Sequence, residues 1–164
     1  MYINLPAMKE RDINTILEQG MSEDSCTCGE LRKAARAVTL LYDNAFKSSG
    51  LLSTQLNVLH VIYKSDSIRI SHLAKELGMD RTTLTRNLSI LERQGFIKIS
   101  PGKDNRTRII TITSKGRTTA AKAIPLWNDV QRKVKQQMGE TLWNELMKNL
   151  SQFVKVADQL NESN

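Results

Sequence analysis

Residues 71–113 have the sequence SHLAKELGMD RTTLTRNLSI LERQGFIKIS PGKDNRTRII TIT. A short apolar pattern with helical spacing ends at Gly78, and a second helix is expected over residues 80–94. Two β-prone runs follow, residues 96–100 and 108–113, and a turn-rich segment separates them. The order of helix, tight turn, helix and hairpin predicts a winged helix-turn-helix over residues 64–113.

The second of these helices has two different faces on a helical wheel. Its leucines fall on one side, and its hydroxyl and guanidinium groups fall within an arc of about 100° on the other. Such a helix fits a major groove, where Arg86 suits a bidentate contact with guanine and the threonines suit phosphates, base edges or a thymine methyl group. A solvated amphipathic helix without a ligand gives the same pattern. The residues expected to face outward are Thr82, Thr85, Arg86, Ser89 and Arg93.

The expected hairpin is also basic. Lys103, Arg106 and Arg108 cluster on it, and Asp104 is the only opposing charge. An arginine at a narrow hairpin tip suits a minor groove, and Asp104 is a candidate for holding Arg106 or Arg108 in an extended rotamer. The alternative is an exposed basic hairpin with no partner.

The excess positive charge is confined to the middle of the chain. Of the net charge of +7, residues 1–63 contribute −1, residues 64–117 contribute +7 and residues 118–164 contribute +1. A basic band between two nearly neutral parts indicates an anionic partner that meets one region of the surface.

Helical patterns flank the expected winged-helix domain. Residues 1–29 are assigned to an N-terminal extension, and residues 30–63 and 114–164 to a helical dimerisation region. The apolar stripe on residues 142–160 exceeds what a small domain can cover, so we expect it to need a partner helix. The alternative is a monomer whose end helices fold back on one domain. We expect Ser53 and Ser71 to be the N-caps of two helices and Asp80 to be the N-cap of a third.

At this point the sequence resembles the MarR family of transcriptional regulators, over about residues 30–160. The wing segment from Asp104 to Gly116 is similar to the family's wing signature, Asp-x-Arg followed by an aliphatic residue and Thr-x-x-Gly. Residues 73–86 resemble its helix-turn-helix, and residues 91–97 resemble its exit into the wing. The extra N-terminal residues and the Cys-x-Cys of Cys26 and Cys28 depart from the general pattern.

The resemblance implies a mainly α protein with a small β-wing, in which a winged helix-turn-helix domain is combined with a helical dimerisation domain. It implies that residues 81–86 enter the major groove and Arg106 the minor groove, and that a small organic effector binds between the two parts. Together with the residue analysis it gives these DNA-binding candidates: Ser71, Arg81, Thr82, Thr83, Thr85, Arg86, Lys103, Arg106 and Arg108, with Asp104 as wing support.

Other functions are weakly supported. The two histidines form no catalytic set, and no phosphate-binding glycine loop occurs, so we expect no enzyme activity, metal or cofactor. Cys26 and Cys28 are a candidate redox pair, although two thiols do not make a structural zinc site. No apolar run is long enough for a membrane span, and the start lacks a secretory pattern, so we expect a cytoplasmic protein.

The sequence thus predicts a homodimeric regulator that binds a palindromic site on double-stranded DNA, a repressor released by a small-molecule or redox signal. Two alternatives are a winged-helix module that binds another protein and a non-specific architectural DNA-binding protein.

Overall fold

The computed structural model describes Asn14, residues 26–102 and residues 107–163. The chain divides into two compact units, Met1–Val38 and Thr39–Asn164, and helix α2 (Thr27–Phe46) crosses the boundary. Among the helices of the described ranges, none is both long and apolar enough to cross a membrane.

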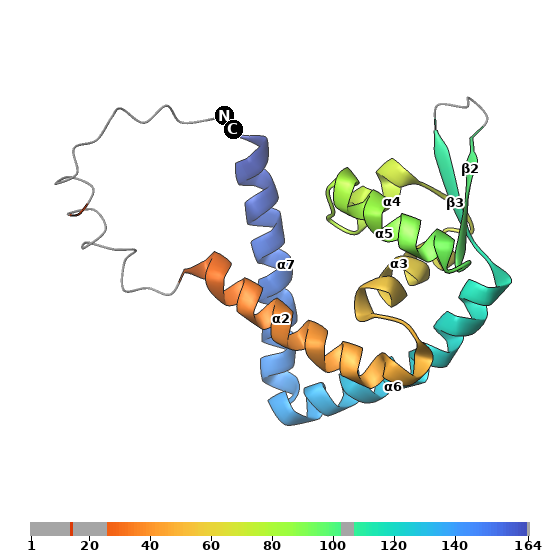
Figure 1. Ribbon diagram of the computed structural model, residues 1–164. Coiled ribbons are helices and arrows are strands. Elements are labelled where there is room, and N and C mark those ends of the chain that lie inside the picture. Colours follow the sequence, from red (N-terminus) through yellow and green to blue (C-terminus); the bar gives the residue numbers. More distant parts are fainter. Residues whose placement is uncertain (1–13, 15–25, 103–106, 164) are drawn as a thin grey trace. The chain divides into compact units, whose positions relative to one another are not determined.

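The second unit contains the predicted succession of elements (Figure 1). Helix, turn, helix and hairpin follow one another here, and two long helices follow the hairpin, so the expectation of a mainly α fold with a small β-wing is confirmed. The elements after α2 are η1 (Lys47–Ser49), α3 (Ser53–Lys64), β1 (Ile68–Arg69), α4 (Ile70–Glu76), α5 (Arg81–Arg93), β2 (Ile97–Pro101), β3 (Arg108–Ile112), α6 (Ser114–Met138) and α7 (Glu140–Glu162).

The three strands form one antiparallel sheet in the order β1-β3-β2. Ile97 lies opposite Ile112 in the β2–β3 hairpin, and Ile68 of β1 lies opposite Ile110. Strand β2 is therefore an edge strand. The backbone N–H of Ile99 on this strand donates to Oε1 of Glu92 at 2.9 Å, which ties the hairpin to the last turn of α5.

One apolar core joins the helix-turn-helix to the sheet and to α3. Leucines of α5 are fully buried in it because they recur every three or four residues and so lie on one side of the helix. Helix α3 contributes Leu56, Val58, Leu59 and Ile62 to the same core. Core side chains with no exposed surface include Phe46, Leu59, Ile62, Leu73, Leu84, Leu88, Leu91 and Ile110.

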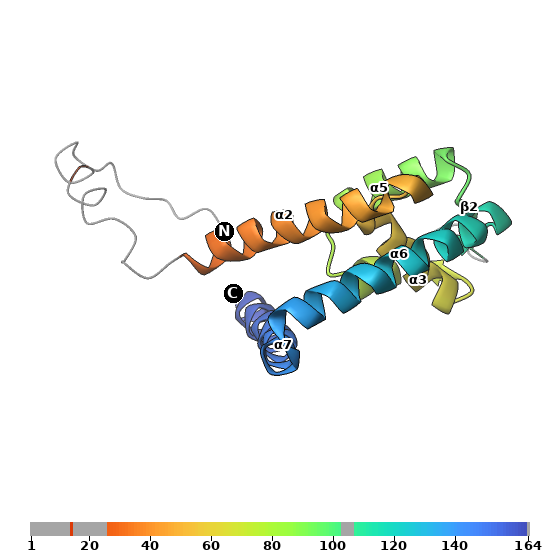
Figure 2. The same ribbon diagram turned by 90° about the horizontal axis from the view of Figure 1, so that it is seen from below.

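The two C-terminal helices pack differently. Helix α6 runs along α3 (Figure 2), and Gly139, at φ +77°, turns the chain into α7. None of the 23 residues of α7 is buried in a single chain. Its exposed apolar side chains are Leu142, Leu146, Met147, Leu150, Phe153, Val154, Val156 and Leu160.

Two of the three predicted N-caps are wrong. Helix α3 is capped by Leu52, whose backbone N–H donates to Oε1 of Gln55, and the N–H of Ser53 donates instead to Oδ1 of Asp43 at 2.7 Å. The cap of α4 is Arg69, because β1 leads directly into that helix, so Ser71 lies within the first turn. Asp80 caps α5 as predicted.

Gly116 allows the closest packing in this unit. A Cβ atom at this position would lie 2.1 Å from the backbone oxygen of Phe96 and 2.9 Å from Cγ1 of Ile112. Because backbone and core atoms cannot easily move away, we expect Gly116→Ala to lower the free energy of unfolding by about 2–3 kcal/mol, measured by urea denaturation.

The matched control is Gly29→Ala, since Gly29 is also helical but meets only ordinary contacts with Cys26, at 3.7 Å or more. Alanine there should be neutral or raise the free energy of unfolding by up to about 1 kcal/mol. Equal effects of the two substitutions would contradict the importance of the close approach at Gly116.

Candidate nucleic-acid interface

The candidate interface is built on α5. Its leucines are buried, so the helix is held on the core with its opposite face in solvent. That face carries three of the predicted DNA-binding side chains, and all three are exposed: Thr82, Thr85 and Arg86. Arg81 is exposed in the first turn of the helix. Ser89 and Arg93 are exposed farther along the helix, as expected.

The N-terminus of α5 is fixed by Asp80. Its Oδ1 accepts a hydrogen bond from the backbone N–H of Thr83 at 2.9 Å. Hydrogen bonds from the side chain and the backbone of Thr83 lower the pKa of Asp80, so this carboxylate stays charged at the positive end of the helix dipole. Thr83 therefore contributes to the cap as well as lying among the candidate residues.

Two hydroxyl groups on the outer face are bonded to the helix itself. Oγ1 of Thr85 donates to the backbone oxygen of Arg81 at 2.7 Å, and Oγ of Ser89 donates to that of Thr85 at 2.9 Å. Such bonds to the preceding turn hold the hydroxyl oxygens outward, where their lone pairs can accept from a base or a water molecule.

Cations of the winged helix differ from those of α6 in their partners. On α6, Arg132 and Lys133 both pair with Asp129, and Lys135 pairs with Glu140. Within the described ranges, the structure gives no ion pair to any cation of α4, α5 or the sheet. These cations are Arg69, Lys75, Arg81, Arg86, Arg93, Lys98 and Arg108. Unpaired basic side chains on one lobe are what phosphate neutralisation requires.

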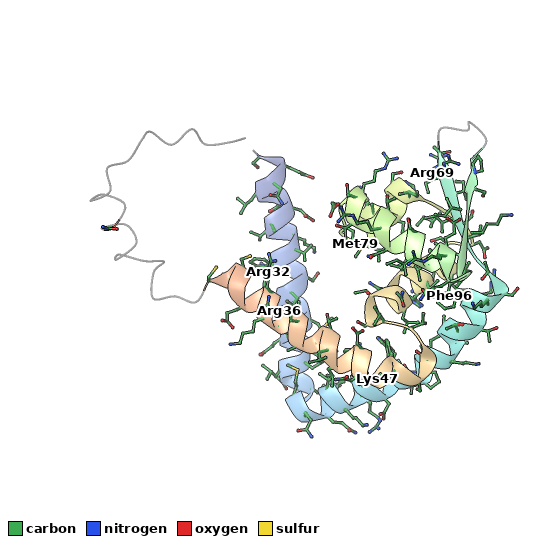
Figure 3. All side chains as sticks on the ribbon, in the orientation of Figure 1. Arg32, Arg36, Lys47, Arg69, Met79 and Phe96 are labelled. Carbon is green, nitrogen blue, oxygen red and sulfur yellow. The ribbon has the colours of Figure 1, made fainter. Side chains whose placement is uncertain are left out.

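Four of these cations were missing from the predicted DNA-binding residues: Arg69, Lys75, Arg93 and Lys98. Arg69 on β1 and Lys98 on β2 share one face of the sheet with Ser100 and Ile109, as the strand register requires. Arg69 lies beside the hairpin in Figure 3. The charge band over residues 64–117 included both, but it could not indicate on which side of a strand each would lie.

The wing candidates are only partly described. Arg108 is exposed at the start of β3, opposite Pro101, and the N–H of Gly102 donates to the backbone oxygen of Thr107 at 2.9 Å. Lys103, Asp104 and Arg106 lie outside the described residues. Ser71 is exposed in the first turn of α4.

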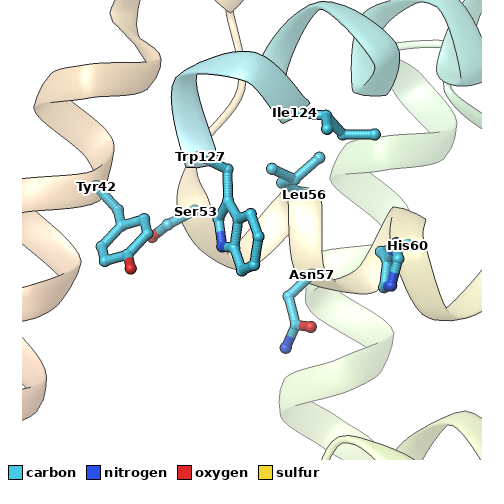
Figure 4. A pocket seen from close by; sticks show the side chains of 7 residues that line it. All are labelled: Tyr42, Ser53, Leu56, Asn57, His60, Ile124 and Trp127. Carbon is cyan, nitrogen blue, oxygen red and sulfur yellow. The ribbon is translucent and has the colours of Figure 1, made fainter. Parts of the chain in front are cut away.

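A pocket of about 260 Å³ lies between α3, α6 and the end of α2 (Figure 4). Trp127 and Ile124 come from α6, and Tyr42 comes from α2. Partial burial raises the pKa of Tyr42, which keeps its phenol a hydrogen-bond donor. The remaining lining residues are Ser53, Leu56, Asn57 and His60, so the pocket is apolar with a few polar groups.

A second pocket of about 330 Å³ adjoins the first through three shared residues, Leu56, His60 and Ile124. Arg117 contributes to its lining, with the guanidinium carbon 5.6 Å from the centre of the Tyr63 ring. His60 is exposed and lines both pockets.

The two cysteines lie at the start of α2. Both are exposed free thiols, and the backbone oxygen of Cys26 accepts a hydrogen bond from the N–H of Glu30 at 3.0 Å. Cys28 is within the first turn of the helix. Both thiols are therefore accessible to reagents at the first turn of α2.

Comparison with known proteins agrees with this geometry. The profile of the MarR family matches residues 51–109. A Bacillus subtilis protein, the uncharacterized HTH-type transcriptional regulator YdgJ, is 31% identical over 42% of this chain and 43% of its own length. The regulator BilQ of Clostridioides difficile is 28% identical over 54% of this chain and 61% of its own length. The chain thus spans about half the length of the curated relatives it matches.

Solved structures match more of the chain. The crystal structure of M. tuberculosis transcriptional regulator MosR in complex with DNA is 37% identical, with a TM-score of 0.77, over 82% of this chain and 98% of that one. A mutant MarR from E. coli complexed with operator DNA has a TM-score of 0.70 over 86% of this chain and 96% of that one, and at 19% identity it supports the fold alone. A likeness of this extent to MosR, together with the family profile over the winged helix, shows that the chain belongs to the MarR family.

Proposed function

We propose that this protein is a transcriptional regulator that binds a specific site on double-stranded DNA and acts as a repressor by covering a promoter. The observation that carries the proposal is the outer face of α5, where exposed hydroxyl and guanidinium groups lie on a helix fixed by three buried leucines. The DNA complex of MosR, 37% identical to this chain, supports it. In this proposal the protein acts by binding DNA and catalyses no reaction. It acts in the cytoplasm, where the promoter DNA lies.

Each candidate side chain has a role that its chemistry suits. Arg86 lies on the outer face of α5 and contacts a guanine edge, while Thr82 and Thr85 contact bases or phosphates. Ser71 and Arg81, each in the first turn of its helix, bind phosphates, where backbone N–H groups add to the attraction.

The wing has a separate role in this proposal. Arg106 enters the minor groove, Lys103 and Arg108 neutralise flanking phosphates, and Asp104 holds Arg106 extended. We add Arg69 and Lys98 as further phosphate contacts, because both are exposed cations without an ion pair to any described carboxylate.

We propose that the protein acts as a homodimer joined through its terminal helices. The apolar side chains of α7 recur at helical spacing and remain exposed in a single chain; Leu150 is 38% exposed and Phe153 is 42% exposed. A two-fold partner would cover this face and would place two copies of α5 about 34 Å apart, as a palindromic site requires.

We further propose that a small molecule or a redox change releases the protein from DNA. The apolar pocket between α3 and α6 supports the first, because it combines aromatic walls from Tyr42 and Trp127 with a few hydrogen-bonding groups. The two exposed thiols at the start of α2 support the second.

Specific binding is tested with a duplex enriched from random DNA by the purified protein. Arg86→Ala should lower the preference for this duplex over random DNA by about 1–3 kcal/mol, since one base contact is lost. Arg106→Ala should weaken binding to both and reduce the salt slope by about 1. Fluorescence anisotropy at several salt concentrations measures both effects.

The matched control for these substitutions is Arg132→Ala, because Arg132 is paired with Asp129 on α6. It should leave affinity, specificity and salt slope unchanged. If Arg86→Ala and Arg106→Ala lowered the affinity for all DNA sequences equally, the result would favour a non-specific architectural DNA-binding protein. Wild-type binding without a steep salt dependence would favour the protein-interaction module.

Dimerisation is tested by light scattering at micromolar concentration. The wild-type mass should be about twice the 18.6 kDa of one chain. Phe153→Arg should shift the mass toward the single chain, because a charge on the apolar face of α7 would be buried in the dimer. Gln152→Arg, a change on the neighbouring polar face, should remain dimeric. A wild-type mass near 18.6 kDa would contradict the proposal.

Release is tested on the protein bound to a labelled duplex. Peroxide should dissociate the wild-type complex but not that of the Cys26→Ser, Cys28→Ser double variant, if the signal acts through the thiols. In the second arm, 2-naphthol should promote dissociation of wild type and do so less for Trp127→Phe, if the pocket receives the signal. Wild-type complexes that persist in both arms would overturn this part of the proposal.

A further inference from the structure

The C-terminal end of α5 meets the first turn of α6, and several hydrogen bonds join the two helices there. Three successive backbone oxygens after α5 accept hydrogen bonds from α6 or its cap. Nζ of Lys115 donates to the oxygen of Gln94 at 2.8 Å, and Oγ1 of Thr113 donates to that of Gly95 at 2.7 Å. The oxygen of Phe96 accepts from the backbone N–H of Thr113 at 3.0 Å.

Backbone hydrogen bonds and close packing fix most of this junction. Thr113 also caps α6, because its Oγ1 accepts from the N–H of Gly116 at 3.0 Å. Gly95 has φ +74°, a conformation that favours glycine, and the backbone of Gly116 lies against Phe96. Figure 3 shows Phe96 where α5, the hairpin and α6 meet.

Lys115 is the charged side chain of this junction. Its ammonium group lies 5.3 Å from the centre of the Phe96 ring while it donates to Gln94. Gln94 is the C-cap of α5, so the ammonium is at the negative end of that helix dipole. Two attractions therefore hold it: the C-cap carbonyl at the negative end of α5, and an aromatic face.

We propose that Lys115 is a positioning residue for DNA recognition, which fixes the direction of α5 relative to α6 by capping α5 from the first turn of the other helix. This inference rests on the proposed function, since it concerns the fit of α5 in a groove. Helix α6 also carries Ile124 and Trp127 in the pocket, so the same junction links the pocket wall to the DNA-binding helix.

The experiment compares Lys115→Met, Lys115→Arg and the control Lys122→Met in the full-length protein. Lys122 is an exposed cation on the same helix, so its replacement removes the same charge. Affinities for the enriched duplex and for a random duplex are measured across salt concentrations, at temperatures where circular dichroism shows every variant folded.

Lys115→Met should lose about fivefold in affinity for the enriched duplex, the magnitude of a helix-terminus charge interaction. Its affinity for random DNA and its salt slope should stay unchanged, because no phosphate contact is removed. Lys115→Arg should restore the affinity to within about twofold, since a guanidinium group can also donate to a carbonyl. Lys122→Met should match wild type.

Two results would overturn the inference. Unchanged affinity and specificity of Lys115→Met, with or without a lower melting temperature, would mean that Lys115 only stabilises the fold. A loss on both duplexes with a salt slope reduced by about 1 would mean that Lys115 contacts a phosphate itself. Failure of wild type to prefer any duplex would instead contradict the proposed function, before any variant is compared.

Discussion

The burial of one row of leucines on α5 is the constraint on which the DNA-binding lobe depends. Leu84, Leu88 and Leu91 have no exposed surface, and they belong to one core cluster with buried residues of α3, α4 and β3. Burying three such side chains is worth several kcal/mol, far more than any exposed polar contact of the helix. The apolar face thus fixes the rotation of α5 about its own axis. Its polar face is then free to carry residues chosen for a ligand rather than for stability.

The ion pairs of the basic side chains also differ between the winged helix and the second half of α6. In the second half of α6, Arg132, Lys133 and Lys135 are neutralised by carboxylates on or beside their own helix, as is usual for a solvated helix surface. The cations of the winged helix have no such partner among the described residues, and the nearby acids are engaged elsewhere: Asp80 caps α5, and Glu92 accepts from Ile99. The positive potential of the lobe is therefore not cancelled locally, which favours an anionic ligand.

Two β-prone runs predicted the hairpin, and the helical spacing of apolar residues predicted α5 and the helical region of residues 114–164. The sequence pattern failed at two helix starts, where tertiary contacts decide: Asp43 takes the N–H of Ser53, and β1 runs straight into α4. Ile124 and Trp127 of α6 are apolar residues at helical spacing, yet both remain over 40% exposed, in a pocket between helices. Periodicity indicates which face of a helix is apolar, but not whether protein, ligand or a second chain covers it.

The bond between Glu92 and Ile99 has a consequence for the sheet as a whole. An edge strand normally offers free N–H groups that can pair with a strand of another molecule. In β2 the N–H of Ile99 already donates to the carboxylate at 2.9 Å, and that carboxylate adds a negative charge along the open edge. A second hairpin approaching this edge would meet an occupied donor and a charge. Strand addition, and the aggregation it can start, is therefore disfavoured on the flank of the protein where a β-hairpin projects.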